Sequence, residues 1–270
     1  MKTPLAGLPV NRFKQRLRAG EQLHGLWTVL ADGYIAELLG GCGYDWLLID
    51  AEHAPNDLRS VLQQVQGIAA SREYLGELAG EVSHPVVRLP HGDPVLIKQY
   101  LEIGVRNLLI PMVETAEQAA ELVKAVNYPT EGTRGLGATL GRASQWGRYR
   151  DYVEKASENI TLILQIESKK GLANFDEIVA TPGVDAVFFG PSDLAADFGL
   201  AGQPAHPEVT AVIDAALEKA LEVGMPSGIM MVDPTAVRAW YDKGVSFAGV
   251  GVDSILLTRA ADALLESFRN

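Results

Sequence analysis

The sequence predicts an α/β protein built as a (β/α)8 TIM barrel. The chain has 270 residues, close to the roughly 250 that such a barrel needs. Eight short apolar runs rich in β-forming residues recur along the chain, and segments with helical periodicity lie between them. No linker or shift in composition divides the chain, so we expect residues 1–270 to form a single barrel domain.

The expected strands are mostly continuous apolar runs, which is typical of strands covered on both faces. They span residues 24–30, 46–50, 84–90, 107–113, 160–167, 186–193, 226–232 and 247–253. An open doubly wound sheet is the alternative arrangement. No G-x-G-x-x-G follows the first run, however, so a nucleotide site of that fold has no support.

Helix signals follow several of these strands. Asn56 is placed to cap a helix after the second strand. Thr115 and Gln118 have the spacing of a capping box after the fourth. Asp233 precedes a proline at the start of a further helix, which Gly244 closes. The alternation of strand and helix therefore continues along the chain.

Two connections are longer than a minimal barrel requires. Residues 71–83 lengthen the return after the second strand, and residues 129–150 form a Gly- and Arg-rich stretch. Loops of this length are usually lids, binding loops or subunit contacts. A mobile surface loop is an equally weighted alternative.

Composition excludes several classes of protein. The formal charge of −11 argues against nucleic-acid binding. No apolar run approaches the roughly 20 residues of a membrane span, and the N-terminus has no secretory signal. We therefore expect a cytoplasmic protein with no membrane partner. Cys42 is the only cysteine, which excludes an intrachain disulfide, and it is interpreted as a packed small residue.

Polar residues gather where the expected strands end. In a (β/α)8 barrel the active site forms at the C-terminal ends of the strands. The side chains that end strands two, three, five and six are therefore expected to converge on one mouth, whereas Asp253 ends strand eight. The converging residues are Asp50, Glu52, His53, Arg88, Gln165, Glu167, Ser192 and Asp193.

Glu167 and Asp193 suggest a metal site. Glu167 ends the most apolar strand, where a carboxylate needs a cation or strong donors to offset its desolvation. Asp193 follows the adjacent strand, and two carboxylates with open positions suit Mg²⁺ or Mn²⁺. Simpler interpretations are that Asp193 is a helix cap and that Arg88 pairs with a surface carboxylate.

Lysine positions argue against imine catalysis. A Schiff-base enzyme needs a lysine that projects from a strand into a dry pocket, and none of the eight runs contains one. Lys169 and Lys170 follow Glu167 and are expected to be solvated.

Among the remaining histidines, only His91 follows a strand closely enough to reach the mouth of the barrel, and it is a weaker candidate for the site.

Several motifs resemble the HpcH/HpaI aldolase family across nearly the whole chain. They are GYDWLLIDAEHAPND, PVVRLPHGDPVLIKQ, RGLGATLGRASQWGR, LILQIESKKG, VFFGPSDLAADFG and VGVDSILLTRA. The resemblance implies a (β/α)8 barrel whose last helix is exchanged between subunits, assembled as a hexamer (a trimer of dimers). It also implies a class II pyruvate aldolase that uses Mg²⁺, Mn²⁺ or Co²⁺.

The resemblance also implies roles for individual residues. Glu167 and Asp193 would be the metal ligands, and Arg88 would bind the pyruvate oxygens. His53 would be the general base, with Asp50 as its acidic partner. The remaining substrate-binding residues would be Gln165, Gly190 and Ser192.

Four features depart from the family pattern. The 71–83 segment is longer than expected, and His91 stands where the family often has an aromatic or polar residue. Ser192 replaces a common alanine. Glu102 replaces an aspartate linked to the catalytic histidine across the subunit boundary. These changes bear on the choice of aldehyde more than on the reaction.

The implied reaction is reversible cleavage of a 4-hydroxy-2-oxo acid into pyruvate and an aldehyde. With 4-hydroxy-2-oxoheptanedioate the aldehyde would be succinic semialdehyde, and the Arg-rich 134–150 loop is a guess for the distal carboxylate. The alternatives are a 2-keto-3-deoxy-sugar-acid aldolase and an acyl-CoA lyase of the same superfamily. A metabolite-binding barrel without turnover is the non-enzymatic alternative.

Overall fold

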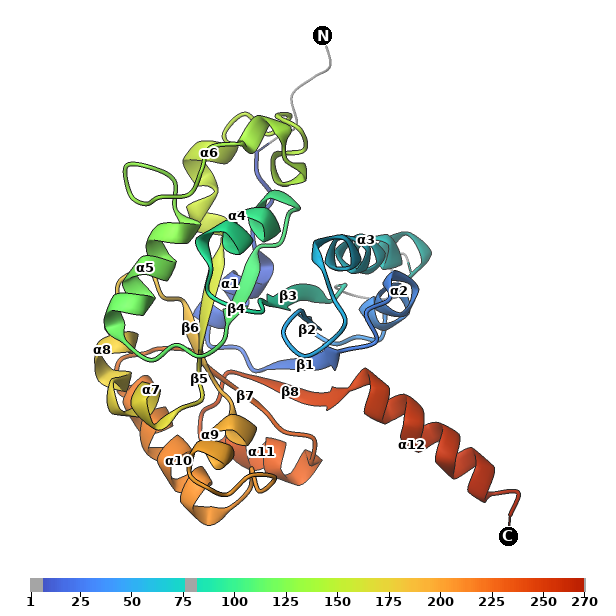
Figure 1. Cartoon of the computed structure of the whole chain (residues 1–270). Coiled ribbons are helices and arrows are strands. Elements are labelled where there is room, and N and C mark those ends of the chain that lie inside the picture. Colours follow the sequence, from blue (N-terminus) through green and yellow to red (C-terminus); the bar gives the residue numbers. More distant parts are fainter. Residues whose placement is uncertain (1–6, 76–81, 270) are drawn as a thin grey trace.

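The computed structural model describes residues 7–75 and 82–269, and eight parallel strands close into a barrel in chain order (Figure 1). This confirms the expected fold. The strands are β1 Leu23–Thr28, β2 Trp46–Asp50, β3 His84–Arg88, β4 Asn107–Ile110, β5 Thr161–Ile166, β6 Ala186–Phe189, β7 Ser227–Met230 and β8 Phe247–Val252.

Most strands are shorter than their apolar runs. β4 ends at Ile110 and β6 at Phe189, whereas the runs continue to residues 113 and 193. Ser192 and Asp193 lie in the helix that follows β6 rather than at the end of the strand. An apolar run predicts burial but not ladder pairing, and a buried loop can continue the same pattern.

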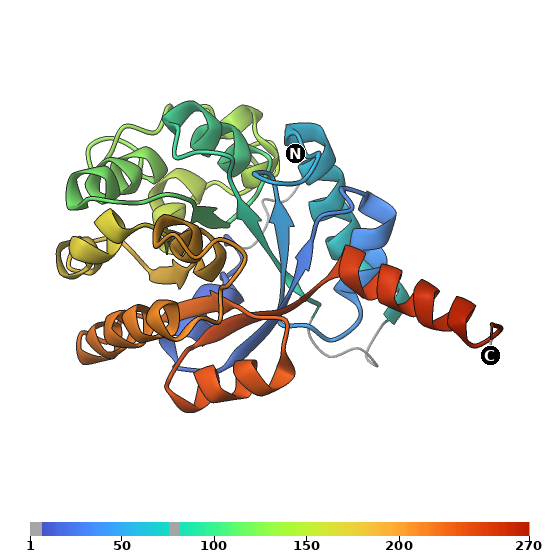
Figure 2. The same cartoon turned by 60° about the horizontal axis from the view of Figure 1, so that its bottom comes forward.

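Helices surround the barrel, as the view in Figure 2 shows. Three short 3₁₀ turns lie between α5 and β5, at Ala138–Leu140, Arg142–Ser144 and Ser157–Asn159. The α-helices of the described residues are α1 Arg12–Arg18, α2 Gly33–Gly40, α3 Leu58–Leu75, α4 Pro94–Glu102, α5 Ala116–Val126, α6 Tyr152–Lys155, α7 Lys169–Ala173, α8 Phe175–Val179, α9 Pro191–Asp197, α10 Pro207–Glu222, α11 Pro234–Asp242 and α12 Asp253–Glu266.

Two of the three expected helix caps are confirmed. Thr115 accepts a hydrogen bond from the backbone N–H of Gln118, and Asp233 accepts one from Thr235. The cap of α3 was wrong by one residue. Asp57, not Asn56, accepts the N–H groups of Arg59 and Ser60, whereas the Asn56 side chain donates to the Asp50 carbonyl at 2.7 Å. The Asn56 side chain therefore ties the loop to the end of β2.

The barrel interior is filled by large aromatic side chains. Trp46 and Phe247 lie 5.8 Å apart between ring centroids, and Phe188 lies 5.7 Å from Phe247. Phe13 of α1 packs edge-on against both Trp46 and Phe247, at 6.3 and 6.0 Å. All four side chains are almost completely buried. The interior is thus a packed core closed by α1, not a channel.

The 129–150 connection is anchored by one buried arginine. The Arg134 side chain is 0% exposed, donates to Glu102 at 3.0 Å and lies over the Tyr128 ring at 4.5 Å. It also donates to the Tyr152 hydroxyl at 3.1 Å. This segment therefore packs on α4 and α6. In the other long connection, residues 71–83, α3 continues to residue 75. Residues 76–81 lie outside the described residues.

The last helix, α12, projects away from the barrel in both overall views (Figures 1 and 2). Several of its apolar side chains are exposed, among them Leu257 at 59% and Leu264 at 64%. No helix within the described ranges is long and apolar enough to cross a membrane. The cytoplasmic location stays a prediction.

Candidate active site

Asp50 and Arg88 form a closely bonded pair at the strand ends. They are the last residues of β2 and β3 and stand opposite each other in the strand register. Arg88 Nη2 lies 2.5 Å from Asp50 Oδ2, and Nε lies 3.0 Å from Oδ1. This two-pronged contact fixes the plane of the guanidinium. Trp27 supports both groups, because its Nε1 donates to Asp50 and its ring lies 5.1 Å from Arg88 Cζ.

Burial and Arg88 have opposite effects on the pKa of Asp50. Burial raises the pKa of Asp50, but the hydrogen bonds and charge of Arg88, together with two backbone hydrogen bonds, bring the pKa below its usual value. The backbone N–H groups of Glu52 and His53 also donate to this carboxylate, at 3.0 and 3.3 Å. Asp50 is therefore held as an anion that fixes both Arg88 and the loop after β2.

The expected contact between Asp50 and the His53 imidazole is not found within the described chain. Asp50 reaches only the backbone of His53, and Glu52 Oε2 lies 3.7 Å from His53 Nε2. Glu52 Oε2 also lies 2.9 Å from Arg88 Nη1. The His53 side chain is 66% exposed. Arg88 occupies both Asp50 oxygens, so Glu52 takes the place beside the ring that the sequence interpretation assigned to Asp50.

Glu167 is a buried carboxylate just beyond the end of β5. Its Oε1 accepts the backbone N–H of Met112 at 2.8 Å, and its Oε2 accepts from the Gln165 amide. Burial raises the pKa of Glu167 to about 7; the two hydrogen bonds oppose this rise, and the charges of Asp193 and Glu52 add to it. A nearby cation would relieve this cost, because it favours the ionised form.

Gly190, the residue after β6, makes room for Glu167. A Cβ at Gly190 would lie 2.6 Å from Glu167 Oε2 and 2.8 Å from Glu167 Cβ, closer than side chains approach. The same Cβ would lie 3.3 Å from the Gln165 amide nitrogen. Gly190 therefore leaves room for the Glu167 side chain, and its expected contact with substrate stays a prediction.

Asp193 and Glu167 share one pocket. A hollow of about 400 Å³ is lined by Glu167 and Asp193, together with Met112 and Ser168. Within residues 7–75 and 82–269, no group of three or more His, Cys, Asp or Glu side chains is arranged to hold a metal. Two carboxylate ligands with the other positions left to water or substrate suit Mg²⁺ or Mn²⁺. Gln165, whose amide donates to Glu167, has a buried Oε1 that accepts no hydrogen bond from any described residue.

The other candidates are exposed or paired with other residues. Ser192 and His91 are exposed, and Glu102 pairs with Arg134. Lys170 is 60% exposed and pairs with Glu114 at 3.0 Å. No lysine lies in any described strand, but Lys169 and Lys170 line the same pocket as Glu167 and Asp193. That no lysine forms an imine stays a prediction. Asp253 has a structural role, because it accepts the N–H groups of Val29 and Leu30 and joins β8 to β1.

Trp27 and Met112 are site residues that the sequence interpretation missed. Trp27 lies in an apolar strand, where nothing distinguishes it from a core residue. Met112 has a positive φ of 54°, a conformation rare for residues other than glycine. That conformation accompanies the N–H bond to Glu167. No local sequence signal marks it, because methionine is not a residue typical of this backbone region.

The fold and the site define the class: a (β/α)8 barrel enzyme with an acidic site at the strand ends. The HpcH/HpaI aldolase/citrate lyase family matches residues 23–260. This chain belongs to that family. It is an aldolase, a carbon–carbon lyase.

Individual relatives agree with this assignment. The chain is 49% identical over 262 residues to a hydroxypyruvate/pyruvate aldolase of Pseudomonas aeruginosa, covering 97% of this chain and 94% of that one. It is 46% identical over 258 residues to a 4-hydroxy-2-oxo-heptane-1,7-dioate aldolase of Escherichia coli, covering 96% and 95%. A crystal structure of a family member from Burkholderia cenocepacia superimposes with a TM-score of 0.91 at 39% identity, covering 97% of this chain and all of that chain.

Proposed function

We propose that the protein cleaves 4-hydroxy-2-oxo acids reversibly into pyruvate and an aldehyde, using a divalent metal held by Glu167 and Asp193. The observation that carries the proposal is the buried Glu167 carboxylate, whose pKa of about 7 is raised by burial and by nearby carboxylates. Such a group is costly to keep ionised unless a cation binds beside it. Mg²⁺, Mn²⁺ and Co²⁺ are the candidate ions.

A bound divalent ion would act as a Lewis acid that stabilises negative charge on the oxygens of an oxo acid. Arg88 supports the same charge from the other side of the mouth, because its guanidinium is fixed by Asp50 and Glu52. Preorganised donors of this kind stabilise a developing enolate without reorganising.

His53 is the proposed general base. Its exposed side chain stands in the loop after β2, within 3.7 Å of Glu52. A histidine is suited to remove the proton of the C4 hydroxyl near neutral pH. Glu52 is the proposed partner that orients the imidazole. Gln165 and Ser192 remain proposed substrate contacts.

Two relatives with different named substrates suggest different aldehydes for this enzyme. One is named for hydroxypyruvate and pyruvate, and the other for 4-hydroxy-2-oxo-heptane-1,7-dioate. Arg142 of the Arg-rich loop lines a cavity at the starts of the strands, and Arg134 is buried against Glu102. A role of this loop in binding a distal carboxylate stays a prediction. The finer choice therefore rests on substrate profiling.

The test measures pyruvate release from a panel of 4-hydroxy-2-oxo acids, with 4-hydroxy-2-oxoheptanedioate included. Activity is expected to vanish after EDTA treatment and dialysis and to return with Mg²⁺ or Mn²⁺. Full activity in excess chelator would overturn the metal assignment. Oxo-acid binding without turnover on any member of the panel would instead favour a binding protein.

We further propose that α12 is exchanged between subunits of a hexamer in which each chain forms one barrel. The exposure of Leu257 and Leu264 supports this, because apolar groups on a projecting helix need cover. Light scattering is expected to give six chains for the wild type and fewer for Leu257→Ser/Leu264→Ser. An unchanged mass for the double variant would contradict helix exchange.

A further inference from the structure

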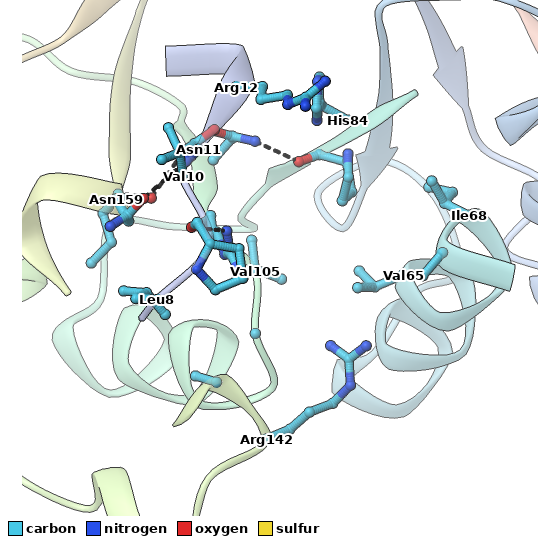
Figure 3. Close-up of a pocket in the computed structure, with 18 of the residues that line it drawn as sticks. Leu8, Val10, Asn11, Arg12, Val65, Ile68, His84, Val105, Arg142 and Asn159 are labelled. Atoms are coloured by element: carbon cyan, nitrogen blue, oxygen red, sulfur yellow. Dashed lines mark hydrogen bonds between the residues drawn. The ribbon is translucent and has the colours of Figure 1, made fainter. Parts of the chain in front are cut away.

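A second cavity lies at the end of the barrel opposite the candidate active site. It has a volume of about 730 Å³ and is lined by the start of β3, by residues just before and after the start of β4, and by α1 and α3. Figure 3 shows Val65 and Ile68 of α3 on one side and Leu8 and Asn11 on the other. Arg142 directs its guanidinium into the space between them.

Two half-buried arginines line this cavity, Arg106 and Arg142. Arg106 donates to the Pro9 carbonyl at 2.8 Å, and Arg142 donates to the Ile103 carbonyl at 2.9 Å. Neither forms an ion pair with a carboxylate anywhere in the described part of the chain. Each guanidinium has five N–H donors, so most of its donors remain available.

The two guanidinium groups also repel each other. Burial lowers the pKa of both arginines, and the charge of Arg106 lowers that of Arg142 further. Placing two cations in one partly dry cavity is unfavourable when, as among the described lining residues, no carboxylate offsets their charge. An anion between them would remove this repulsion and satisfy the free donors.

The lining carries one sign of charge. Among the described residues it includes four arginines and no Asp or Glu, in a chain whose formal charge is −11. The two further arginines are Arg72 and Arg12, of which Arg12 has an interaction partner of its own. Burial lowers the pKa of His84, also in the lining, to about 4, and Arg16 and Arg12 add to this effect. Arg106 and Arg142 thus make the described lining locally positive on an acidic protein, which favours anions.

Gly104 makes the position of Arg142 possible. Its φ is +94°, and a Cβ there would lie 2.8 Å from Arg142 Nη1. Any side chain at position 104 would therefore displace the Arg142 guanidinium. Gly104, at the end of α4, and the Arg142 turn are built to fit each other at the wall of the cavity.

We propose that this cavity binds a small organic anion, with its oxyanion group between Arg106 and Arg142 and an apolar body against Val65 and Ile68. A guanidinium pair matches the geometry of phosphate and carboxylate groups. A cavity of about 730 Å³ with apolar walls is large enough for more than an inorganic ion. This site is independent of the proposed reaction.

The test is calorimetric titration of the Mg²⁺-loaded enzyme, saturated with pyruvate to occupy the candidate active site. Phenyl phosphate and phenylacetate are the two anionic probes, and benzyl alcohol is the neutral one. We expect saturable binding of at least one anion and at least tenfold weaker binding of the alcohol. If only phenyl phosphate binds, the cavity is a phosphate site. If only phenylacetate binds, it is a carboxylate site.

Variants locate the bound anion. Arg106→Gln and Arg142→Gln are each expected to lower the affinity for the anion at least tenfold, the usual loss for a charge-assisted hydrogen bond. Arg150→Gln is the matched control, because Arg150 is exposed in the same segment and does not line the cavity. Absence of anion binding, or equal affinity in all four proteins, would overturn the proposal.

A second measurement does not depend on the variants folding. Phenylglyoxal labelling of wild-type arginines, read by peptide mass spectrometry, is repeated with and without the bound anion. Protection is expected at Arg106 and Arg142 and not at Arg150. Equal labelling with and without saturating anion would overturn the site assignment.

Discussion

Arg88 is held by three contacts that only a guanidinium makes together. Its Nε and Nη2 meet Asp50, and its Nη1 lies 2.9 Å from Glu52. Arg88→Lys keeps the charge but supplies one ammonium in place of the fork. We expect kcat/KM for pyruvate release to fall about 100-fold, or about 2.7 kcal/mol.

The matched control for this substitution is Arg150→Lys, which changes an exposed arginine. It is expected to keep wild-type kcat/KM. An Arg88→Lys enzyme within threefold of the wild type would show that charge alone suffices, and the role of the fork would have to be abandoned.

Glu167 makes metal binding depend on pH near neutrality. Burial raises its pKa to about 7, so below that pH the metal must displace a proton. We expect the apparent Kd for Mn²⁺ to rise about tenfold per pH unit below 7 and to level off above it. Competition with a chromophoric chelator between pH 5.5 and 8.5 measures this. A flat profile across that range would contradict the assignment.

The same group affects the stability of the metal-free protein. Its pKa is higher in the folded chain (about 7) than the ordinary 4.5 expected after unfolding. The folded state therefore binds more protons between these values, and its stability falls as the pH rises through about 7. Glu167→Gln is expected to remove this component. Denaturant unfolding in chelator at pH 5 and pH 8 measures it; equal pH dependence in both proteins would contradict it.

At the scale of elements, the β6–α9 junction determines where Glu167 lies. A Cβ at Gly190 would come within 2.8 Å of the Cβ of Glu167, so Gly190→Ala must displace that side chain. We expect at least tenfold weaker metal binding with the fold retained, measured by Mn²⁺ titration and circular dichroism. Gly137→Ala is the control, because nothing lies within 4 Å of its Cβ. Equal affinities would show that the junction tolerates a side chain.

Elements also show where sequence interpretation succeeds. The order and location of the eight strands, though not all of their ends, and the caps at Thr115 and Asp233 were predicted correctly, because burial patterns and cap hydrogen bonds act over a few residues. The cap of α3 was misplaced by one residue because Asn56 and Asp57 are both good caps. The tie from Asn56 to the Asp50 carbonyl decided between them.

At the scale of the whole molecule, α1 closes the barrel through Phe13. This side chain is 0% exposed and packs against Trp46 and Phe247. Phe13→Ala is expected to reduce the free energy of unfolding by about 3–5 kcal/mol, the range for a buried aromatic truncated to alanine. Urea unfolding measures it.

The control for Phe13 is Val223→Ala, which changes a side chain that is 62% exposed. Its effect is expected to stay within about 0.5 kcal/mol. A loss below 1 kcal/mol for Phe13→Ala would mean that α1 is an accessory element and not part of the barrel core.

The candidate site was predictable as a set of residues but not as a network. Position at a strand end follows from the fold, so Arg88, Glu167 and His53 could be named in advance. Their partners could not. Asp50 and Arg88 are 38 residues apart, and their contact depends on the register of β2 against β3. Trp27 joins them from a third strand.

The sequence by itself determined the barrel and the candidate chemistry, because apolar periodicity, caps and residue types are local properties. The tertiary structure alone decided that Asp50 is bonded to Arg88 and that Glu52 lies beside His53. It likewise decided that the backbone N–H of Met112 donates to Glu167. It also decided that Arg142 faces a cavity at the far end of the barrel. Contacts of this kind depend on closure of the barrel, which brings distant residues within hydrogen-bonding range.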